Sequence, residues 1–358
     1  MQVIKIIRDI NSSLGVKLPR IQAEEARLRL IKAGILLKAK KIIKNRDFVY
    51  LPISDSASLV NILEDLEYQI EYQVFPDELL KPSIIDSLKL EFPDEPWEEI
   101  SVKFDQIGEI GLLRLDSELT SKAFRLKVGT KILSAYPKIN SVLNKLDITE
   151  GIKRTFPIEF LAGEEKYESW HKEYGVLIKV DLKNAYFNPR LAEEHRRLSL
   201  EVTNDDRILD LFTGVGPFSL HCAKEHHCEV IAVDINPYAI KNLNASIKRN
   251  KLKGSIIPII GDAGKVFREN RYFDRIIINL PNHSINYLAY ASKLVKNGGI
   301  ITFYQFVEKN IQPPQSLVSI IDEKLKNVCT YDILTNRVGR EVSPSRIQVN
   351  VDLRIYNE

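Results

Sequence analysis

Four carboxylate or amide side chains stand at equivalent places in the second half of this 358-residue chain, each close to the end of an apolar run. They are Asp210, Asp234, Asp262 and Asn279. The runs have the composition of buried strands, and open α/β sheets bind their ligands at the carboxyl ends of the strands. An acid at such a place can accept hydrogen bonds from ribose hydroxyls. The set indicates a nucleoside-bearing cofactor, although any one of these residues alone is more simply a capping or loop residue.

A glycine-rich turn, Gly214-Val215-Gly216, follows the first apolar run and precedes a segment with helical spacing. A helix that begins after such a turn offers free backbone N–H groups and the positive end of its dipole to an anionic ligand group. The turn departs from the dinucleotide fingerprint G-x-G-x-x-G, because Ser219 stands where the last glycine would be. A nicotinamide dehydrogenase therefore remains only as an alternative.

From about residue 181 the chain alternates regularly between strand and helix patterns. We expect strands at residues 207–212, 229–233, 255–260, 274–279 and 299–306. This alternation predicts a doubly wound, Rossmann-like parallel sheet, with two smaller α/β or α+β domains before it. Residues 330–337 and 346–355 form two more strand patterns, and the short turn between them permits only an antiparallel hairpin.

A parallel nucleotide-binding sheet that ends in an antiparallel hairpin resembles the class I S-adenosylmethionine-dependent methyltransferase fold. In this interpretation the backbone at residues 214–217 passes the methionine part of the cofactor, Asp234 binds the ribose hydroxyls, and Asp262 with Ala263 meets the adenine. The expected cofactor-binding residues of these loops are Phe212, Gly214, Val215, Gly216, Pro217, Asp234, Ile235, Asp262, Ala263 and Asn279.

The charge distribution divides the chain into a basic, an acidic and a basic part. Residues 1–46 carry 12 lysines and arginines against 3 acidic residues, whereas residues 47–118 carry 4 against 18. Two separated basic surfaces would suit a polyanion such as RNA, and solvated helix faces would explain the same pattern. We expect three domains, at residues 1–73, 74–180 and 181–358.

Other features of the composition indicate a cytoplasmic protein without a metal site. No run approaches the length of a membrane span, the N-terminus lacks an uninterrupted apolar stretch, and the three cysteines have no framework spacing. A dense group of histidines and cysteines between His221 and Cys228 continues a helix and lacks the paired spacing of structural zinc sites.

The segment VDLKNAYFNPRLAEEHRR (residues 180–197) turns at Pro189 and starts a helix that leads into the first sheet strand. Here the chain resembles the archaeal and eukaryotic tRNA (guanine-37, N1)-methyltransferases. The resemblance covers all three domains, through VKLPRIQAEEARLRLIKAGIL, FDQIGEIGLLRL, KRTFPIEFLAGE, DLFTGVGPFS, DINP, NLP and SPSRIQVNVDLRIY.

The resemblance implies roles for individual residues. Glu194 would be the general base, which guanine N1 needs because it carries a proton, and Arg154 would stabilise the negative charge on O6. Asn279 with Pro281 would orient the base edge or the cofactor. The remaining two implied positions are Tyr186 in the pocket wall and His195 at the cofactor, where many family members have arginine. Without the resemblance, Glu194 is an acid favoured by a helix dipole, and Arg154 a surface or phosphate-binding arginine.

The resemblance also implies a tRNA substrate and a monomeric enzyme. The basic N-terminal domain would reach the outer corner of the tRNA, and the other two domains would hold the anticodon loop. Three further alternatives stay open: a second activity on the tricyclic wyosine intermediate at the same nucleotide, a methyltransferase for a different RNA base, and an RNA-binding protein that has lost catalysis.

Overall fold

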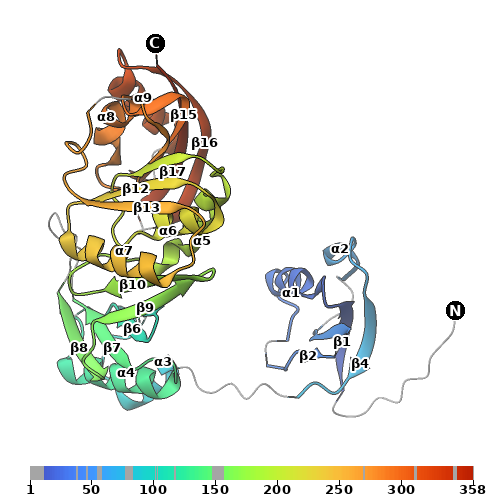
Figure 1. The fold of residues 1–358 in the computed structure, drawn as a ribbon. Coiled ribbons are helices and arrows are strands. Elements are labelled where there is room, and N and C mark those ends of the chain that lie inside the picture. Colours follow the sequence, from blue (N-terminus) through green and yellow to red (C-terminus); the bar gives the residue numbers. More distant parts are fainter. Residues whose placement is uncertain are drawn as a thin grey trace. The chain divides into compact units, whose positions relative to one another are not determined.

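The computed structural model describes residues 12–37, 39–45, 47–54, 59–76, 84–100, 102, 104–116, 118–146, 157–268, 271–309, 313–341 and 345–357. The chain forms two compact units, Met1–Ser87 and Leu88–Glu358 (Figure 1). Within the described residues, no helix combines the length and the apolar character that crossing a membrane requires.

The first unit is an antiparallel sheet packed against helices. Its strands lie in the order β2 (Ile43–Lys44), β3 (Phe48–Pro52), β1 (Ser13–Pro19) and β4 (Gln69–Gln73). The helices are α1 (Ala23–Lys32) and the short α2 (Leu59–Ile62).

Helix α1 covers this sheet with one apolar face. Its buried residues Ala23, Ala26 and Leu30 are spaced three and four apart, so they share one side of the helix. Leu30 belongs to the same buried core as Leu18 of β1 and other strand residues. The helix ends just before Gly34, whose φ of +73° lies in the left-handed region that glycine adopts without steric cost.

The second unit begins with a smaller sheet of mixed direction. Helix α3 (Ile84–Glu91) spans the division between the units, and the sheet has the order β5 (Phe104–Ile107), β6 (Ile110–Leu113), β7 (Ser141–Lys145) and β8 (Ile158–Gly163). Strands β6 and β7 are parallel, because α4 (Lys122–Ala135) connects them as a crossover. A separate hairpin of β9 (Glu168–Glu173) and β10 (Val176–Asp181) follows.

The core of this smaller sheet continues into the large C-terminal domain. Ile107 and Leu143 of the sheet share one buried cluster with Ile178 of β10 and with Ile240 and Leu243, which lie in the C-terminal domain. The hairpin of β9 and β10 therefore packs between the two parts and joins their cores.

A seven-stranded sheet forms the C-terminal domain. Its strands lie in the order β13 (Ser255–Ile260), β12 (Glu229–Asp234), β11 (Arg207–Asp210), β14 (Phe273–Ile278), β15 (Val295–Glu308), β17 (Arg346–Tyr356) and β16 (Thr330–Glu341). The first five strands in this order, from β13 through β12, β11 and β14 to β15, are parallel to one another. Strand β17 is antiparallel to both of its neighbours. The predicted Rossmann-like sheet with an antiparallel final hairpin is confirmed.

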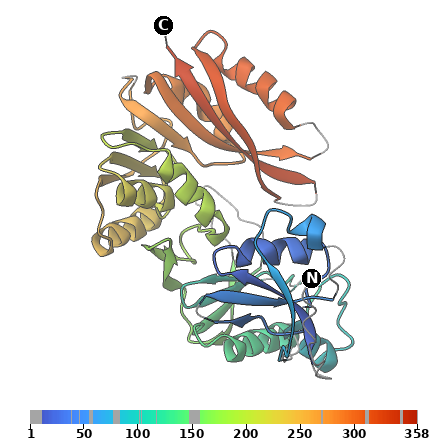
Figure 2. The same cartoon turned by 90° about the vertical axis from the view of Figure 1, so that its right-hand side faces the viewer.

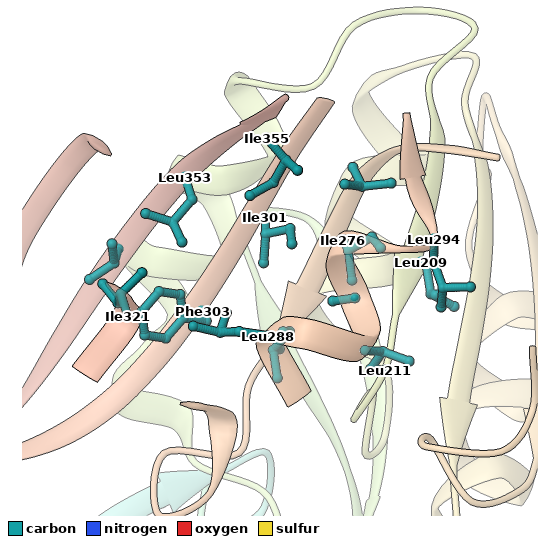
Figure 3. Close-up of a cluster of buried hydrophobic side chains, with 14 of the residues drawn as sticks. Leu209, Leu211, Ile276, Leu288, Leu294, Ile301, Phe303, Ile321, Leu353 and Ile355 are labelled. Atoms are coloured by element: carbon teal, nitrogen blue, oxygen red, sulfur yellow. The ribbon is translucent and has the colours of Figure 1, made fainter. Parts of the chain in front are cut away.

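Helices cover both faces of this sheet. They are α5 (Ala192–Leu200), α6 (Pro217–Glu225), α7 (Pro237–Arg249), α8 (Leu288–Ser292) and α9 (Pro313–Leu325), with the 3-10 helices η1 (Pro189–Leu191) and η2 (Ser284–Tyr287). Because strand side chains alternate, Ile276 packs in the cluster of α8 and α9, whereas its neighbour Ile277 packs with α5 and α6 on the other face. Figure 3 shows the first of these clusters around Ile276, Leu288 and Ile321.

The last strand in the sequence is not the edge of the sheet. Strand β17 lies between β15 and β16 and pairs with both along most of its length. Figures 1 and 2 show these long strands, orange to red, side by side. On β17 the side chain of Asp352 is buried and accepts hydrogen bonds from Thr302 on β15 and from Arg337 on β16.

Candidate active site

A cavity of about 610 Å³ opens at the carboxyl ends of the parallel strands. The loops after β11, β12, β13 and β14 line it, together with the segment from Tyr186 to α5. The sheet order reverses direction between β11 and β14, and such a switch point is where open α/β sheets bind ligands. The predicted site residues that line the cavity are Tyr186, His195, Phe212, Gly214, Val215, Pro217, Asp234, Ile235, Asp262, Ala263, Asn279 and Pro281.

The glycine turn has a conformation that other residues would strain. Gly214 and Gly216 have φ values of +56° and +81°. A Cβ atom on Gly216 would lie 2.3 Å from Cδ1 of Leu243, which is closer than packed atoms come. Gly216 is the N-cap of α6 and Pro217 its first residue, a combination that starts the helix. Gly216 itself does not line the cavity. It faces Leu243 of α7 instead.

Asp234, at the end of β12, joins two loops of the cavity wall. Its Oδ2 accepts a hydrogen bond of 2.8 Å from the backbone N–H of Gly214, and its Oδ1 accepts one of 2.8 Å from that of Asn236. Asp234 also lines the cavity, so its carboxylate is an acceptor within reach of a ligand there.

Asp210 lies beneath the turn and has a different environment. It is fully buried, it is not a lining residue, and its Oδ2 accepts a hydrogen bond of 2.8 Å from Ser219 Oγ. Burial raises the pKa of the Asp210 carboxyl to about 6, because the charged form loses its hydration. The structure therefore assigns Asp210 to the support of the turn, although the sequence pattern grouped it with the ligand-binding acids.

Glu194, in the first turn of α5, does not line the cavity. Leu191, three residues before it, and His195, directly after it, do. Its carboxylate forms a two-pronged ion pair with Arg197, at 2.6 and 2.9 Å, and Oε1 also accepts a hydrogen bond of 2.8 Å from the Tyr304 hydroxyl. A carboxylate has about four acceptor positions. These three bonds leave one of them, on Oε2, for a further donor.

The remaining predicted catalytic residue, Arg154, lies outside the described residues. Two side chains that the sequence did not indicate contribute to the cavity wall from β15 and β17, namely Phe306 and Gln348. Phe306 ends the expected strand at residues 299–306 and Gln348 lies in the motif SPSRIQVNVDLRIY, but the sequence analysis assigned neither side chain to the site.

Behind His195 lies a buried polar group that the sequence did not indicate either. His195 Nδ1 is 2.8 Å from Oε2 of Glu173 on β9, and His221 Nε2 of α6 is 3.3 Å from the same oxygen. Burial alone would raise the pKa of the Glu173 carboxyl, but the contacts with His195 and His221 outweigh burial and lower it to about 2. Burial lowers the pKa of His195. Cys222 and Cys228, from the same stretch of sequence as His221, lie in a hydrophobic cluster instead.

Comparison with known protein families gives matches in both units. Residues 169–334 match the TRM5/TYW2 methyltransferase domain, residues 84–166 match the TYW2 N-terminal domain, and residues 15–59 match the tRNA methyltransferase 5 N-terminal domain.

Individual relatives align with most of the chain. The tRNA (guanine(37)-N(1))-methyltransferase Trm5b of Pyrococcus abyssi is 31% identical over 343 residues, which are 96% of this chain and 99% of the relative. The tRNA 4-demethylwyosine(37)-methyltransferase Taw21 of Saccharolobus solfataricus is 29% identical over 267 residues, 74% of this chain and 97% of the relative. Among solved structures, aTrm5 in complex with tRNALeu has 30% identity and a TM-score of 0.67, covering 96% of this chain and 99% of that one.

Proposed function

The chain belongs to the TRM5/TYW2 methyltransferase family, and we propose that it transfers a methyl group from S-adenosylmethionine to N1 of guanosine 37 in tRNA. The main support from the structure is one cavity that gathers the strand-end residues Asp234, Asp262 and Asn279 with the segment at Tyr186 and His195. The strand ends suit a nucleoside cofactor, and the second segment belongs to the stretch at residues 180–197 that carries the resemblance to the tRNA methyltransferases.

The lining of the cavity fits the proposed cofactor. Asp234 places a carboxylate, an acceptor suited to ribose hydroxyls, in the cavity wall, and the adjacent Ile235 is 46% exposed. Ile235 and Ala263 together offer the apolar contact that an adenine ring needs. S-Adenosylmethionine, when bound, supplies an electrophilic methyl group on a sulfonium centre.

The proton on guanine N1 must leave as the new N–CH3 bond forms. We assign this proton to Glu194, because Oε2 retains an acceptor position while Arg197 and Tyr304 fix the carboxylate. Arg154 is proposed to stabilise the negative charge that develops on O6. Asn279 and Pro281, which line the cavity, are proposed to orient the base edge.

Because glutamate accepts the proton in this scheme, the base must present a proton at N1. We expect methyl transfer to a tRNA transcript that carries guanosine 37, and no transfer to the same transcript with adenosine 37. Nuclease digestion followed by mass spectrometry would detect 1-methylguanosine in the first case. Methylation of the adenosine transcript would overturn the guanine-N1 assignment.

A second activity is supported by the alignment with Taw21. A relative named for 4-demethylwyosine 37 aligns with 74% of this chain, so the same cavity is a candidate for the tricyclic base. The same assay with tRNA bearing that intermediate would test this activity, and an absence of methyl transfer to it would restrict the enzyme to guanosine.

The N-terminal domain, with its strongly basic residues 1–46, is proposed to bind tRNA away from the anticodon. Deletion of residues 1–73, which removes strands β1 to β4, should then lower kcat/KM on whole tRNA by about tenfold or more, since phosphate contacts supply much of the affinity. Activity on an isolated anticodon stem-loop should change much less. An equal loss on both substrates would contradict a distant contact.

A further inference from the structure

Glu173, at the end of β9, has a buried carboxylate with histidines around it. His195 of α5 and His221 of α6 approach Oε2 at 2.8 and 3.3 Å, and Nε2 of His171, also on β9, is 3.6 Å from Oε1. The side chain of Glu173 is only 1% exposed, and those of His195 and His221 are 2% exposed. One ligand atom from each of Glu173, His195 and His221 lies within 4.8 Å of the others.

Within the described part of the chain, this carboxylate has no permanent cation beside it. Among the described residues, no lysine or arginine nitrogen comes within 4 Å of Glu173, and its ionic contacts are all with histidines. A buried charge is costly unless a counter-charge or hydrogen bonds compensate it. The compensation here is incomplete, because Glu173 Oε1 and His221 Nε2 are both buried without a hydrogen-bond partner in the described part of the chain.

His171 differs from the other two histidines because a backbone contact fixes its protonation. The N–H of Gly108 donates to His171 Nδ1 at 3.3 Å, so Nδ1 is the acceptor and the ring hydrogen is on Nε2, which faces Glu173. Burial lowers the pKa of His171 and favours this neutral form. His171 therefore turns an N–H, not a lone pair, toward Glu173, at a distance too long for a hydrogen bond, so it is not a candidate ligand.

We propose that Glu173, His195 and His221 form a binding site for one divalent transition-metal ion of the zinc class. Imidazole nitrogens and a carboxylate are the ligands that Zn²⁺ takes, whereas Mg²⁺ and Ca²⁺ prefer oxygen alone. With Zn–N and Zn–O bonds of about 2.0–2.1 Å, tetrahedral ligands are roughly 3.3 Å apart. The contacts of 2.8 and 3.3 Å in the structure are close to that spacing, so the ion needs only small side-chain shifts.

The metal accounts for both unpartnered atoms. His221 Nε2 becomes a ligand, and Glu173 Oε1 either becomes a second ligand atom or accepts a hydrogen bond from a metal-bound water. The ion would also join β9 to α5 and α6 more firmly than the present contacts of Glu173 with His195 and His221 do. Its role is to stabilise the wall of the cavity behind His195.

Metal binding would also change which nitrogen of the His195 ring carries the hydrogen. Without the ion, Nδ1–H donates to Glu173 and Nε2 is an acceptor. With the ion on Nδ1, Nε2 carries the hydrogen and becomes a donor. His195 lines the cavity, so the occupied site presents a donor where the empty site presents an acceptor.

Titration of the chelator-treated full-length protein with CoCl2, without tRNA or S-adenosylmethionine, tests the site separately from the methyltransferase proposal. We expect one Co²⁺ per chain with the intense visible absorption of a tetrahedral ion, and displacement by ZnCl2. Glu173→Gln and His221→Gln should abolish this absorption. His227→Gln is the matched control, because His227 is exposed and near His221 in sequence but outside the cluster.

Two measurements keep the test valid if a variant at these buried positions fails to fold. ZnCl2 at 100 times its Kd should raise the thermal unfolding midpoint of the wild-type protein by roughly 5 °C. In crystals soaked with ZnCl2, the anomalous signal should lie about 2.0–2.1 Å from His195 Nδ1 and His221 Nε2. Absence of any bound ion, or an ion at other residues, would overturn the proposal.

Discussion

Glu194→Gln is expected to slow methyl transfer to guanosine 37 by roughly 100- to 10,000-fold, the range that loss of a general base produces. Glutamine keeps the size of the side chain and an oxygen for the Tyr304 hydroxyl, but it cannot take the N1 proton. The single-turnover rate at saturating S-adenosylmethionine measures this effect. The Kd of S-adenosylmethionine, measured by calorimetry, should change little, since Glu194 does not line the cavity.

The neighbouring residue provides the matched control. Glu193 lies in the same first turn of α5 but is exposed, so Glu193→Gln should retain the wild-type rate. If both variants lost activity equally, a change in the charge of the helix terminus would explain the result better than a base. A Glu194→Gln enzyme with normal rates would remove this residue from the reaction.

Asp234→Asn is expected to weaken S-adenosylmethionine binding by roughly 10- to 100-fold, because hydrogen bonds to a charged group contribute about 1.5–3 kcal/mol. An amide retains only one oxygen, so it cannot accept from Gly214 and Asn236 while also binding ribose hydroxyls. Calorimetric titration with the cofactor gives the Kd. The single-turnover rate at saturating cofactor should fall less than the affinity.

Glu229→Gln separates this effect from a general weakening of the strand. Glu229 begins β12, at the end opposite Asp234, and lies away from the cavity. Its replacement should leave cofactor affinity unchanged. Equal losses in the two variants would indicate a disturbed β12, and unchanged affinity in Asp234→Asn would exclude the ribose contact.

The arrangement of the cavity follows from the sequence where it depends on local patterns. Apolar runs predict the parallel strands, and the topology of such a sheet brings the residues after them to one edge, so Asp234, Asp262 and Asn279 meet there. Asp210 shows the limit of this reasoning. The alternation of side chains across a strand and the depth of burial determine that it supports the turn, and neither is evident from an acid at the end of a run.

Contacts between distant segments could not be predicted in this way. Tyr304 is 110 residues from Glu194, and only the tertiary fold brings its hydroxyl to the carboxylate. Strand β9 has the sequence ESWHKE, which lacks apolar alternation, so the sequence predicts no strand there and gives no reason to place Glu173 beside His195 and His221. These interactions are specified by packing in three dimensions.

The interior position of β17 has a consequence for how the C-terminal domain assembles. Strand β16 precedes β17 in the chain but reaches the sheet only through it, so neither can be in place before residues 346–356 have been made. Until then β15 has an unpaired edge, a surface on which partly folded chains aggregate. Asp352 arrives with β17 and completes the hydrogen bonds to Thr302 and Arg337, so closure of the sheet and pairing of these polar groups occur in one late step.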